Sequence, residues 1–111
     1  MPVLNIDKLD FDKEVLHSDG AVAIKFITFW DSICRSFSET FEECAKEYEG
    51  KIRFFESNID GNPDLAEQLG ISKVPTVVLF LNGKELKRLI NPSKPFFKAE
   101  LESLAKKARR I

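Results

Sequence analysis

The sequence has few of the residues that build metal centres and nucleophilic sites. Its 111 residues include two cysteines, Cys34 and Cys44, and one histidine, His17. The histidine is too isolated for a Cys–His nucleophile, and the cysteine and histidine spacing of zinc sites does not occur. The sequence contains neither a phosphate-binding glycine loop nor a serine nucleophile elbow. We therefore expect no metal and no cofactor, and we expect His17 to be a surface residue near a helix end.

The chain also lacks an excess of charge of one sign. It has 17 Lys and Arg against 18 Asp and Glu, a net charge of -1 at pH 7, so we expect no nucleic acid and no membrane among its partners. The longest apolar run, Val74–Leu81, contains Pro75 and Thr76 and is far shorter than the ~20 residues of a membrane-spanning helix. No basic segment followed by an apolar stretch opens the sequence. We therefore expect no export signal and a cytoplasmic location, where both cysteines are thiols.

In contrast, the sequence is rich in residues for a core. Hydrophobic residues make up 43% of the chain, and ten residues are Phe. A chain of this length buries enough surface to form a core without disulfides or metal ions. No linker, repeat or low-complexity segment interrupts it. We therefore predict a single domain over residues 1–111.

Hydrophobic periodicity predicts strands that alternate with helices, followed by a hairpin and a last helix. The expected strands are Val3–Ile6, Ala21–Trp30, Ile52–Ile59, Thr76–Leu81 and Glu85–Ile90, and the expected helices are Asp7–His17, Ser32–Tyr48, Pro63–Leu69 and one capped by Ser93 or Lys94. Ala21–Trp30 is apolar with almost no alternation, which indicates a central strand buried on both faces. Together these elements predict a three-layer α/β domain with a mixed sheet.

Local residues predict how some of these elements begin and end. Asn62 and Pro63 are typical of a helix N-cap and first helical position. Asn82-Gly83 favours a tight hairpin turn, because both central positions of that turn need positive φ. The two strands beside this turn are therefore expected to be antiparallel.

Three segments resemble the thioredoxin family. Phe26–Cys34 (FITFWDSIC) is similar to the family's strand-to-helix segment, which ends in Trp-Cys-Gly-Pro-Cys. Ser57–Thr76 (SNIDGNPDLAEQLGISKVPT) is similar to its middle segment, and Leu79–Lys84 (LFLNGK) to its hairpin. The resemblance covers nearly the whole chain. It implies a thioredoxin-like fold, with a central mixed β-sheet flanked by helices on both faces, a function in cell redox homeostasis, and Pro75 as the cis-proline beside the active site.

The chain departs from this family at the active-site motif. Asp31 stands where the family has its attacking cysteine, Ser32-Ile33 replaces Gly-Pro, and Cys34 stands at the resolving cysteine. Thiol–disulfide exchange needs a thiolate that attacks and a second thiol that releases the mixed disulfide, and a carboxylate does neither. We therefore expect no protein-disulfide reductase turnover through positions 31 and 34, and at most monothiol chemistry at Cys34.

Neither cysteine is expected to restore that chemistry. If both lie on one helix, ten residues place Cys44 about 15 Å from Cys34 along the axis, whereas a disulfide needs Cα atoms within ~7 Å. We expect Cys44 to be a small apolar core residue. A helix N-terminus favours a Cys34 thiolate, but burial and the Asp31 carboxylate oppose it, which favours a structural thiol. Asp31 is among the best N-cap residues, so we place capping above catalysis for it.

A second departure concerns two charges in the interior. The family keeps an acidic residue in the strand before the active site and a lysine in the next strand, and uses the pair to handle protons for the buried cysteine. Here Lys25 and Glu56 occupy those positions with the signs exchanged. A buried charge is costly unless it is paired. We therefore expect Lys25 and Glu56 to form an ion pair, with a structural role favoured over proton handling.

The resemblance also implies a substrate groove. Its residues are Trp30, Ile33, Val74, Pro75 and Asn91, the last in place of a family glycine, which narrows the site. Such a groove holds an extended polypeptide through strand-like hydrogen bonds and apolar contact. Two functions remain open. One is a redox protein whose partner is a thiol- or disulfide-containing protein, and the other is a non-enzymatic module that binds an extended polypeptide.

Overall fold

The structure is a computed structural model that describes residues 3–109. The strands of this part of the chain are β1 (Val3–Asn5), β2 (Ala21–Ile27), β3 (Ile52–Asn58), β4 (Thr76–Leu81) and β5 (Lys84–Ile90). Its helices are α1 (Lys8–Phe11), the π-helix η1 (Asp12–Leu16), α2 (Ser32–Glu47), α3 (Pro63–Leu69) and α4 (Lys94–Ala108).

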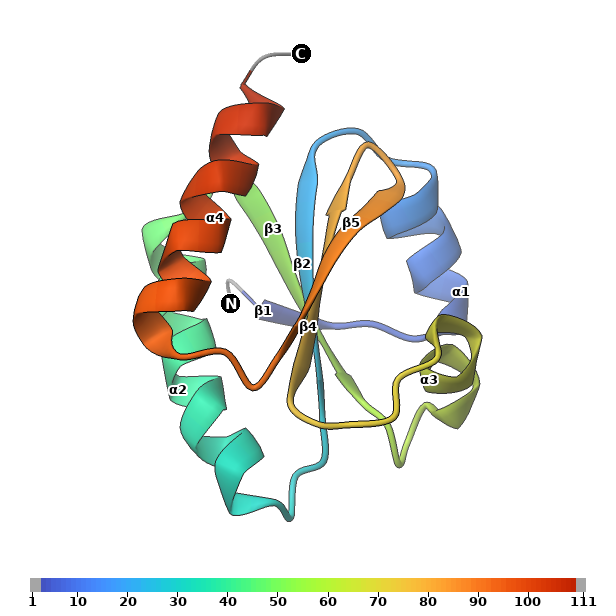
Figure 1. Ribbon diagram of the computed structural model, residues 1–111. Helices are drawn as coiled ribbons and strands as arrows, with labels where there is room; N and C mark the ends of the chain where they lie inside the picture. Colours follow the sequence, from blue (N-terminus) through green and yellow to red (C-terminus); the bar gives the residue numbers. More distant parts are fainter. Residues whose placement is uncertain (1–2, 110–111) are drawn as a thin grey trace.

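The strands form one mixed sheet in the order β1-β3-β2-β4-β5 (Figure 1). β1, β3 and β2 are parallel to one another, whereas β4 is antiparallel to both β2 and β5. β2 lies at the centre, and all seven of its residues are buried. The predicted mixed sheet, the central position of β2 and the antiparallel hairpin are thus confirmed.

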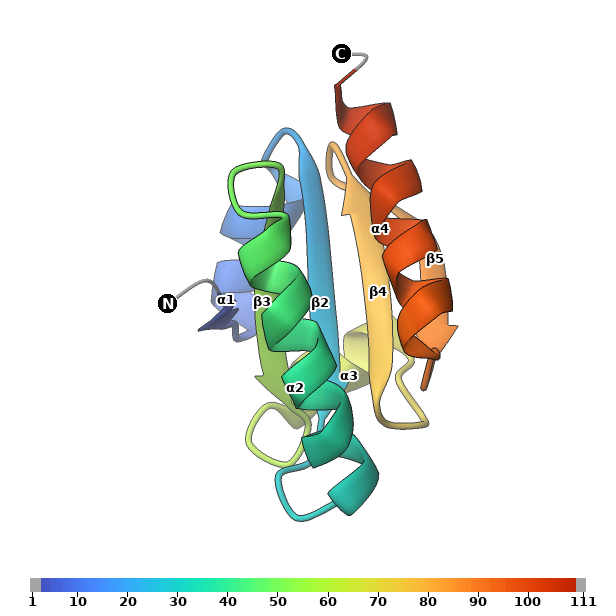
Figure 2. The same cartoon turned by 90° about the vertical axis from the view of Figure 1, so that its left-hand side faces the viewer.

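The helices form two outer layers. α2 and α4 cover one face of the sheet, while α1, η1 and α3 cover the other (Figures 1 and 2). Successive residues of a strand point to opposite faces. Ala21 and Ala23 of β2 therefore belong to the apolar cluster under α2 and α4, and Val22 and Ile24 to the cluster under α1 and α3. By the same alternation, Lys25 points toward α2.

Local sequence explains how α2, α4 and the hairpin are bounded. The side chains of Asp31 and Ser93 accept hydrogen bonds from backbone N–H groups in the first turns of α2 and α4, respectively. In the hairpin turn, Asn82 and Gly83 have φ angles of 52° and 81°. Gly83 is also required by space, because a Cβ there would collide with the Leu16 carbonyl oxygen. These predicted caps and this predicted turn are confirmed.

The prediction of one continuous helix over residues 7–17 is wrong, because the structure has two helical segments there. The chain forms α1 and then the wider turn of η1, which ends as the N–H of His17 donates to the Asp12 carbonyl. The Arg53 side chain of β3 donates to the Glu14 carbonyl, which the short helix leaves without a partner. This long-range contact is not encoded in the local apolar pattern. His17 itself is an exposed residue at the end of η1, as expected.

Two further expectations are corrected at element ends. Asn62 occupies the N-cap position of α3, but its side chain makes no capping bond there and instead donates to the Asn58 carbonyl at 3.5 Å. β2 ends at Ile27 rather than Trp30, because the chain turns away from the sheet after that residue.

Within residues 3–109, no helix combines the length and the apolar character needed to cross a bilayer.

Candidate functional site

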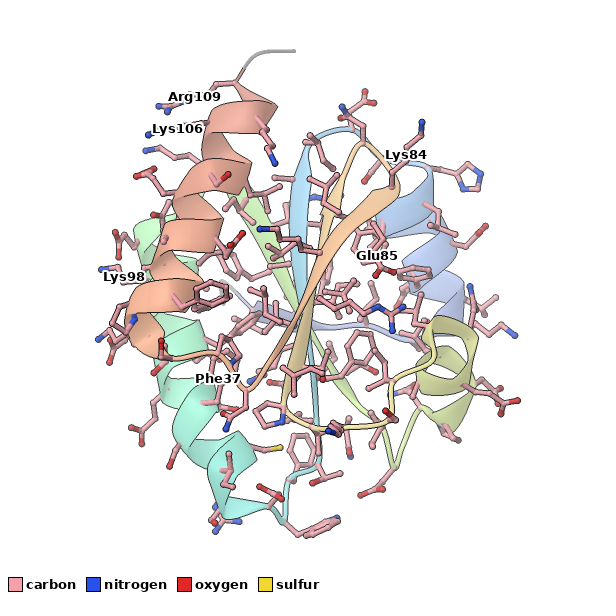
Figure 3. The ribbon with its side chains drawn as sticks, viewed as in Figure 1. Phe37, Lys84, Glu85, Lys98, Lys106 and Arg109 are labelled. Atoms are coloured by element: carbon pink, nitrogen blue, oxygen red, sulfur yellow. The ribbon has the colours of Figure 1, made fainter. Side chains whose placement is uncertain are left out.

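The candidate site lies at one end of the sheet, where β2 leads into α2. The β5–α4 link joins it there, because the N–H of Asn91 donates to the Pro75 carbonyl at 2.8 Å. The Val74–Pro75 peptide bond is cis. The hairpin turn that precedes Lys84 lies at the opposite end of the sheet (Figure 3). The β2–α2 link, the Val74–Pro75 segment and the β5–α4 link therefore meet at this end of the sheet.

The β2–α2 link presents apolar side chains to solvent. Phe29, Trp30 and Ile33 are 56%, 72% and 54% exposed. The indole N–H of Trp30 donates to Asp60 Oδ2 at 2.9 Å, which fixes the ring toward the link after β3. Sequence reasoning missed Asp60, because thirty residues separate it from Trp30 and no local pattern pairs them. Large exposed aromatic surface of this kind is typical of a contact surface for another polypeptide.

A surface hollow lies beside this apolar segment. It is lined by Ser32, Ile33, Ser36, Phe37, Thr40, Asn91 and Pro92. Phe37, labelled in Figure 3, is buried at its base, and its ring centroid lies 5.4 Å from that of Phe97 in α4. Ile33 and Asn91 thus share one hollow. Val74 and Pro75 do not line it but are joined to it through the Asn91–Pro75 hydrogen bond.

The first turn of α2 carries the candidate reactive residues. The backbone N–H groups of Ile33 and Cys34 both donate to Asp31 Oδ1, at 2.8 and 3.0 Å. The Cys34 side chain is fully buried. Asp31 therefore acts as the helix cap, and its carboxylate occupies the N–H groups that would otherwise stabilise an anion at this helix end.

Cys44 lies on the same helix, ten residues after Cys34, and both are free thiols. Cys44 is buried in the apolar cluster between the sheet and the helices α2 and α4. This burial raises the pKa of its thiol above the ordinary value, with a smaller contribution from the nearby Glu47 carboxylate. The expectation that Cys44 is a core residue is confirmed.

The interior charge, Lys25, is held by three groups. Its Nζ lies 2.8 Å from Glu56 Oε1 and donates to Ser38 Oγ at 2.7 Å. It also lies 5.0 Å from the ring centroid of Phe41, within cation–π range. The side chain of Lys25 is 0% exposed and that of Glu56 is 19% exposed. Lys25 and Glu56 therefore form the ion pair that the sequence predicts.

Ser38 is a site residue that sequence reasoning missed. Its hydroxyl accepts from Lys25 and donates to the Cys34 carbonyl at 2.9 Å. A signal for it exists in the sequence, since Ser38 lies four residues after Cys34 and three before Phe41, both buried residues of α2. No cluster of three or more metal-ligating side chains occurs among residues 3–109.

A five-stranded mixed sheet between two helical layers, with a long helix that begins where the central strand ends, is the architecture of the thioredoxin-like class of folds. A family model described as "Thioredoxin" matches residues 2–107. The chain belongs to the thioredoxin family, a redox-related family of proteins.

Individual relatives agree with this assignment. Thioredoxin of Rickettsia bellii is 40% identical over 81 residues, which are 73% of this chain and 77% of the relative. The chloroplastic thioredoxin M5 of Oryza sativa subsp. japonica is 36% identical over 88 residues, 79% of this chain and 51% of that protein. The crystal structure of Malassezia sympodialis thioredoxin (Mala s 13) matches with a TM-score of 0.84 at 25% identity, covering 93% of this chain and 90% of that one.

Proposed function

We propose that this protein serves cell redox homeostasis without dithiol turnover, and that it retains at most monothiol chemistry at Cys34. The observation that supports this is the first turn of α2, where the Asp31 carboxylate caps the helix. The family resemblance places the attacking cysteine at that position. Cys44 is about 15 Å further along the same helix axis and does not supply a second thiol.

The electron balance defines what one thiol does. In a dithiol reductase, the attacking sulfur bonds to one sulfur of the target disulfide and the other leaves as a thiolate, after which the second thiol displaces the target. Cys34 alone completes only the first exchange, in which its S–S bond to the target forms as the target's own S–S bond breaks. Release then requires a small thiol from solution. We infer a reducing compartment such as the cytoplasm, where such thiols are present and both cysteines stay reduced.

A non-enzymatic binding module is the second candidate. The exposure of Trp30 and Ile33 favours it, because these side chains offer apolar contact while the Cys34 thiol is buried. The groove residues Val74, Pro75 and Asn91 lie close by, and an extended polypeptide is the partner that fits strand-like pairing beside them. In this function Lys25 and Glu56 have only a structural role.

Asp31→Cys tests the loss of dithiol turnover. The variant places two thiols at positions 31 and 34 of a helix N-terminus, which stabilises a thiolate. We expect a 31–34 disulfide to form and the reduction of a model protein disulfide to rise from background to a measurable rate. Asp31→Ser, which removes the carboxylate without adding a thiol, should stay at background. A variant that forms this disulfide yet reduces nothing would show that Asp31 is not what prevents turnover.

A trapping experiment separates the two candidate functions. Folded protein is mixed with a peptide that carries an activated mixed disulfide, and with the same peptide carrying alanine in place of that cysteine. Monothiol chemistry predicts a covalent adduct at Cys34 that Cys34→Ala abolishes. A binding module predicts equal, reversible binding of both peptides, which Trp30→Ala weakens and Cys34→Ala does not.

A further inference from the structure

A chain of polar contacts, one ion pair followed by two hydrogen bonds, connects solvent to the first turn of α2 through the protein interior. It begins at Glu56, whose side chain is partly exposed, and continues to the ammonium group of Lys25 at 2.8 Å. Lys25 donates to the Ser38 hydroxyl at 2.7 Å, and this hydroxyl donates to the Cys34 carbonyl at 2.9 Å. Three elements, β3, β2 and α2, are joined by these contacts.

The chemistry of the donors fixes the direction of this chain. An ammonium group has three donors and no acceptor, so the Ser38 oxygen must accept from Lys25. The single proton of the hydroxyl is then left to donate to Cys34, four residues earlier. A hydrogen bond that includes a charged partner is shorter and about twice as strong as a neutral one. Lys25 therefore holds the Ser38 side chain in the orientation that binds the Cys34 carbonyl.

The first turn of α2 is thus held from both sides. Asp31 accepts from the N–H of Cys34, and Ser38 donates to the carbonyl of the same residue. For the buried thiol to reach a reagent in solvent, this turn must open. Opening it breaks the bond between the Ser38 hydroxyl and the Cys34 carbonyl, and the hydroxyl, which Lys25 still holds in place, loses its acceptor at a cost in free energy.

We propose that Ser38 is a positioning residue, which together with Lys25 keeps the first turn of α2 closed over Cys34 and so limits the reaction of its thiol. The proposal rests on the proposed function in one respect, since it concerns the thiol to which monothiol chemistry is assigned. The labelling rate of Cys34 is measurable whether that thiol serves catalysis or only structure, so the test below is separate from the test of the proposed function.

Cys44 provides an internal reference within the same helix. It is buried as Cys34 is, but it packs in the apolar cluster under α4 rather than beside the chain of polar contacts. Local opening of the first turn exposes Cys34 alone, whereas global unfolding exposes both thiols. The ratio of the two labelling rates therefore separates an effect on the turn from a general loss of stability.

Ser38→Ala is the main test, with iodoacetamide as the probe and mass spectrometry to quantify each cysteine. In this reaction the sulfur forms a bond to the CH₂ carbon, the C–I bond breaks, and iodide and the thiol proton pass to solvent. We expect Cys34 labelling about tenfold faster than in the wild type, equivalent to ~1.4 kcal/mol, with Cys44 labelling unchanged. Ser38→Thr retains the hydroxyl and should restore the slow rate.

The matched control is Ser103→Ala, because Ser103 is an exposed serine inside α4 and the substitution changes helix propensity in the same way. It should leave both labelling rates unchanged. Lys25→Met removes the group that orients Ser38, and adding Ser38→Ala to it should produce no further increase. If Lys25→Met does not fold, the comparison of Ser38→Ala with Ser38→Thr still shows whether the Ser38 hydroxyl slows the labelling of Cys34.

Three outcomes would overturn the proposal. One is an unchanged Cys34 rate in Ser38→Ala, and another is an equal rise for Cys34 and Cys44, which indicates general destabilisation. The third is a faster Cys34 labelling rate that is explained entirely by a shift of the rate's pH profile. Such a shift indicates that the substitution changes the ionisation of the thiol rather than the opening of the turn. None of these outcomes bears on dithiol turnover, which the Asp31→Cys variant tests separately.

Discussion

The two ends of α2 each bury a cysteine, but in different surroundings. At the first end two polar side chains bind the backbone of Cys34: Asp31 accepts from its N–H, and Ser38 donates to its carbonyl. At the other end Cys44 lies in an apolar cluster, and burial raises the pKa of its thiol. One helix therefore has a polar end at the candidate site and an apolar end in the core.

This difference separates the part of the helix that carries function from the part that anchors it. The rings of Phe37, Phe41 and Phe97 lie within 5.4 to 6.1 Å of one another between α2 and α4. The ion pairs of Glu43 with Lys94 and of Glu47 with Lys98 join the same helices, but they are exposed and such pairs contribute little. Aromatic packing fixes α2, which leaves its first turn free to carry costly polar contacts.

The largest effect is expected at the interior ion pair beside the polar end. Glu56→Gln leaves the fully buried Lys25 ammonium without its counter-charge and should cost on the order of 3–5 kcal/mol of unfolding free energy. Lys25→Met leaves Glu56 unpaired, but this carboxylate is partly exposed and water solvates it. Its cost should therefore be smaller. Urea denaturation of both variants measures which of them loses more unfolding free energy.

The double variant sharpens the same test. Each single substitution forfeits the same interaction, so Lys25→Met with Glu56→Gln should cost less than the sum of the two. Lys87→Met is a control, because its pair with Glu100 is largely exposed on the lysine side and its loss should stay within about 1 kcal/mol. Strict additivity at Lys25 and Glu56 would mean that the pair is not energetically coupled.

Much of the fold was predictable because its signals are local. An apolar strand without alternation, Ala21–Trp30, indicated the centre of the sheet, and Asn82-Gly83 indicated the hairpin. The prediction of one helix over residues 7–17 was wrong, because the chain forms α1 and then η1 there, and the Arg53 contact to the Glu14 carbonyl comes from a strand that follows much later in the sequence. Asn62 occupies the N-cap position of α3 without a capping bond, and its amide N–H donates to the Asn58 carbonyl, a contact that the N-cap pattern of the sequence does not indicate.

A site residue could be predicted from the sequence where its own position would cost free energy without a partner. A charge within an apolar strand requires a partner, which identified Lys25 and Glu56, and an aspartate before a helix identified the Asp31 cap. Ser38 and Asp60 were missed because a hydroxyl and a surface carboxylate carry no such cost until their partners are known. Both depend on contacts across elements, with Lys25 and Trp30.

Serine substitutions compare the two ends of α2 directly. Cys44→Ser places a hydroxyl in an apolar cluster, and an unsatisfied buried polar group costs about 1–3 kcal/mol. Cys34→Ser should cost less, because Cys34 belongs to neither of the two apolar clusters that contain the core. Denaturation curves of both variants test this order, with the two alanine variants as controls for lost volume. A larger loss for Cys34→Ser would contradict the contrast between a polar and an apolar end.

A smaller effect is expected in the pH dependence of stability. The raised pKa of Cys44 means that the folded protein keeps this thiol protonated where the unfolded chain ionises. The unfolded state then binds fewer protons, so stability should fall as pH rises above about 8.5, the ordinary value for cysteine. Burial raises the pKa of Tyr48 as well and extends this fall to higher pH. Cys44→Ala should flatten the curve between pH 8 and 10 in thermal denaturation; an unchanged slope would contradict the assignment.

The last prediction is an effect of zero. Mild oxidation of the folded monomer should form no bond between Cys34 and Cys44, because α2 is continuous between them and holds them about 15 Å apart along its axis. Intact mass spectrometry should show no loss of two hydrogens, only unmodified monomer and adducts on a thiol that becomes exposed. The Asp31→Cys variant is the positive control, since its 31–34 pair has the spacing that a disulfide bridges at a helix N-terminus. A 34–44 disulfide in the wild type would require α2 to unwind between its two ends, so the polar and the apolar end would not belong to one rigid helix.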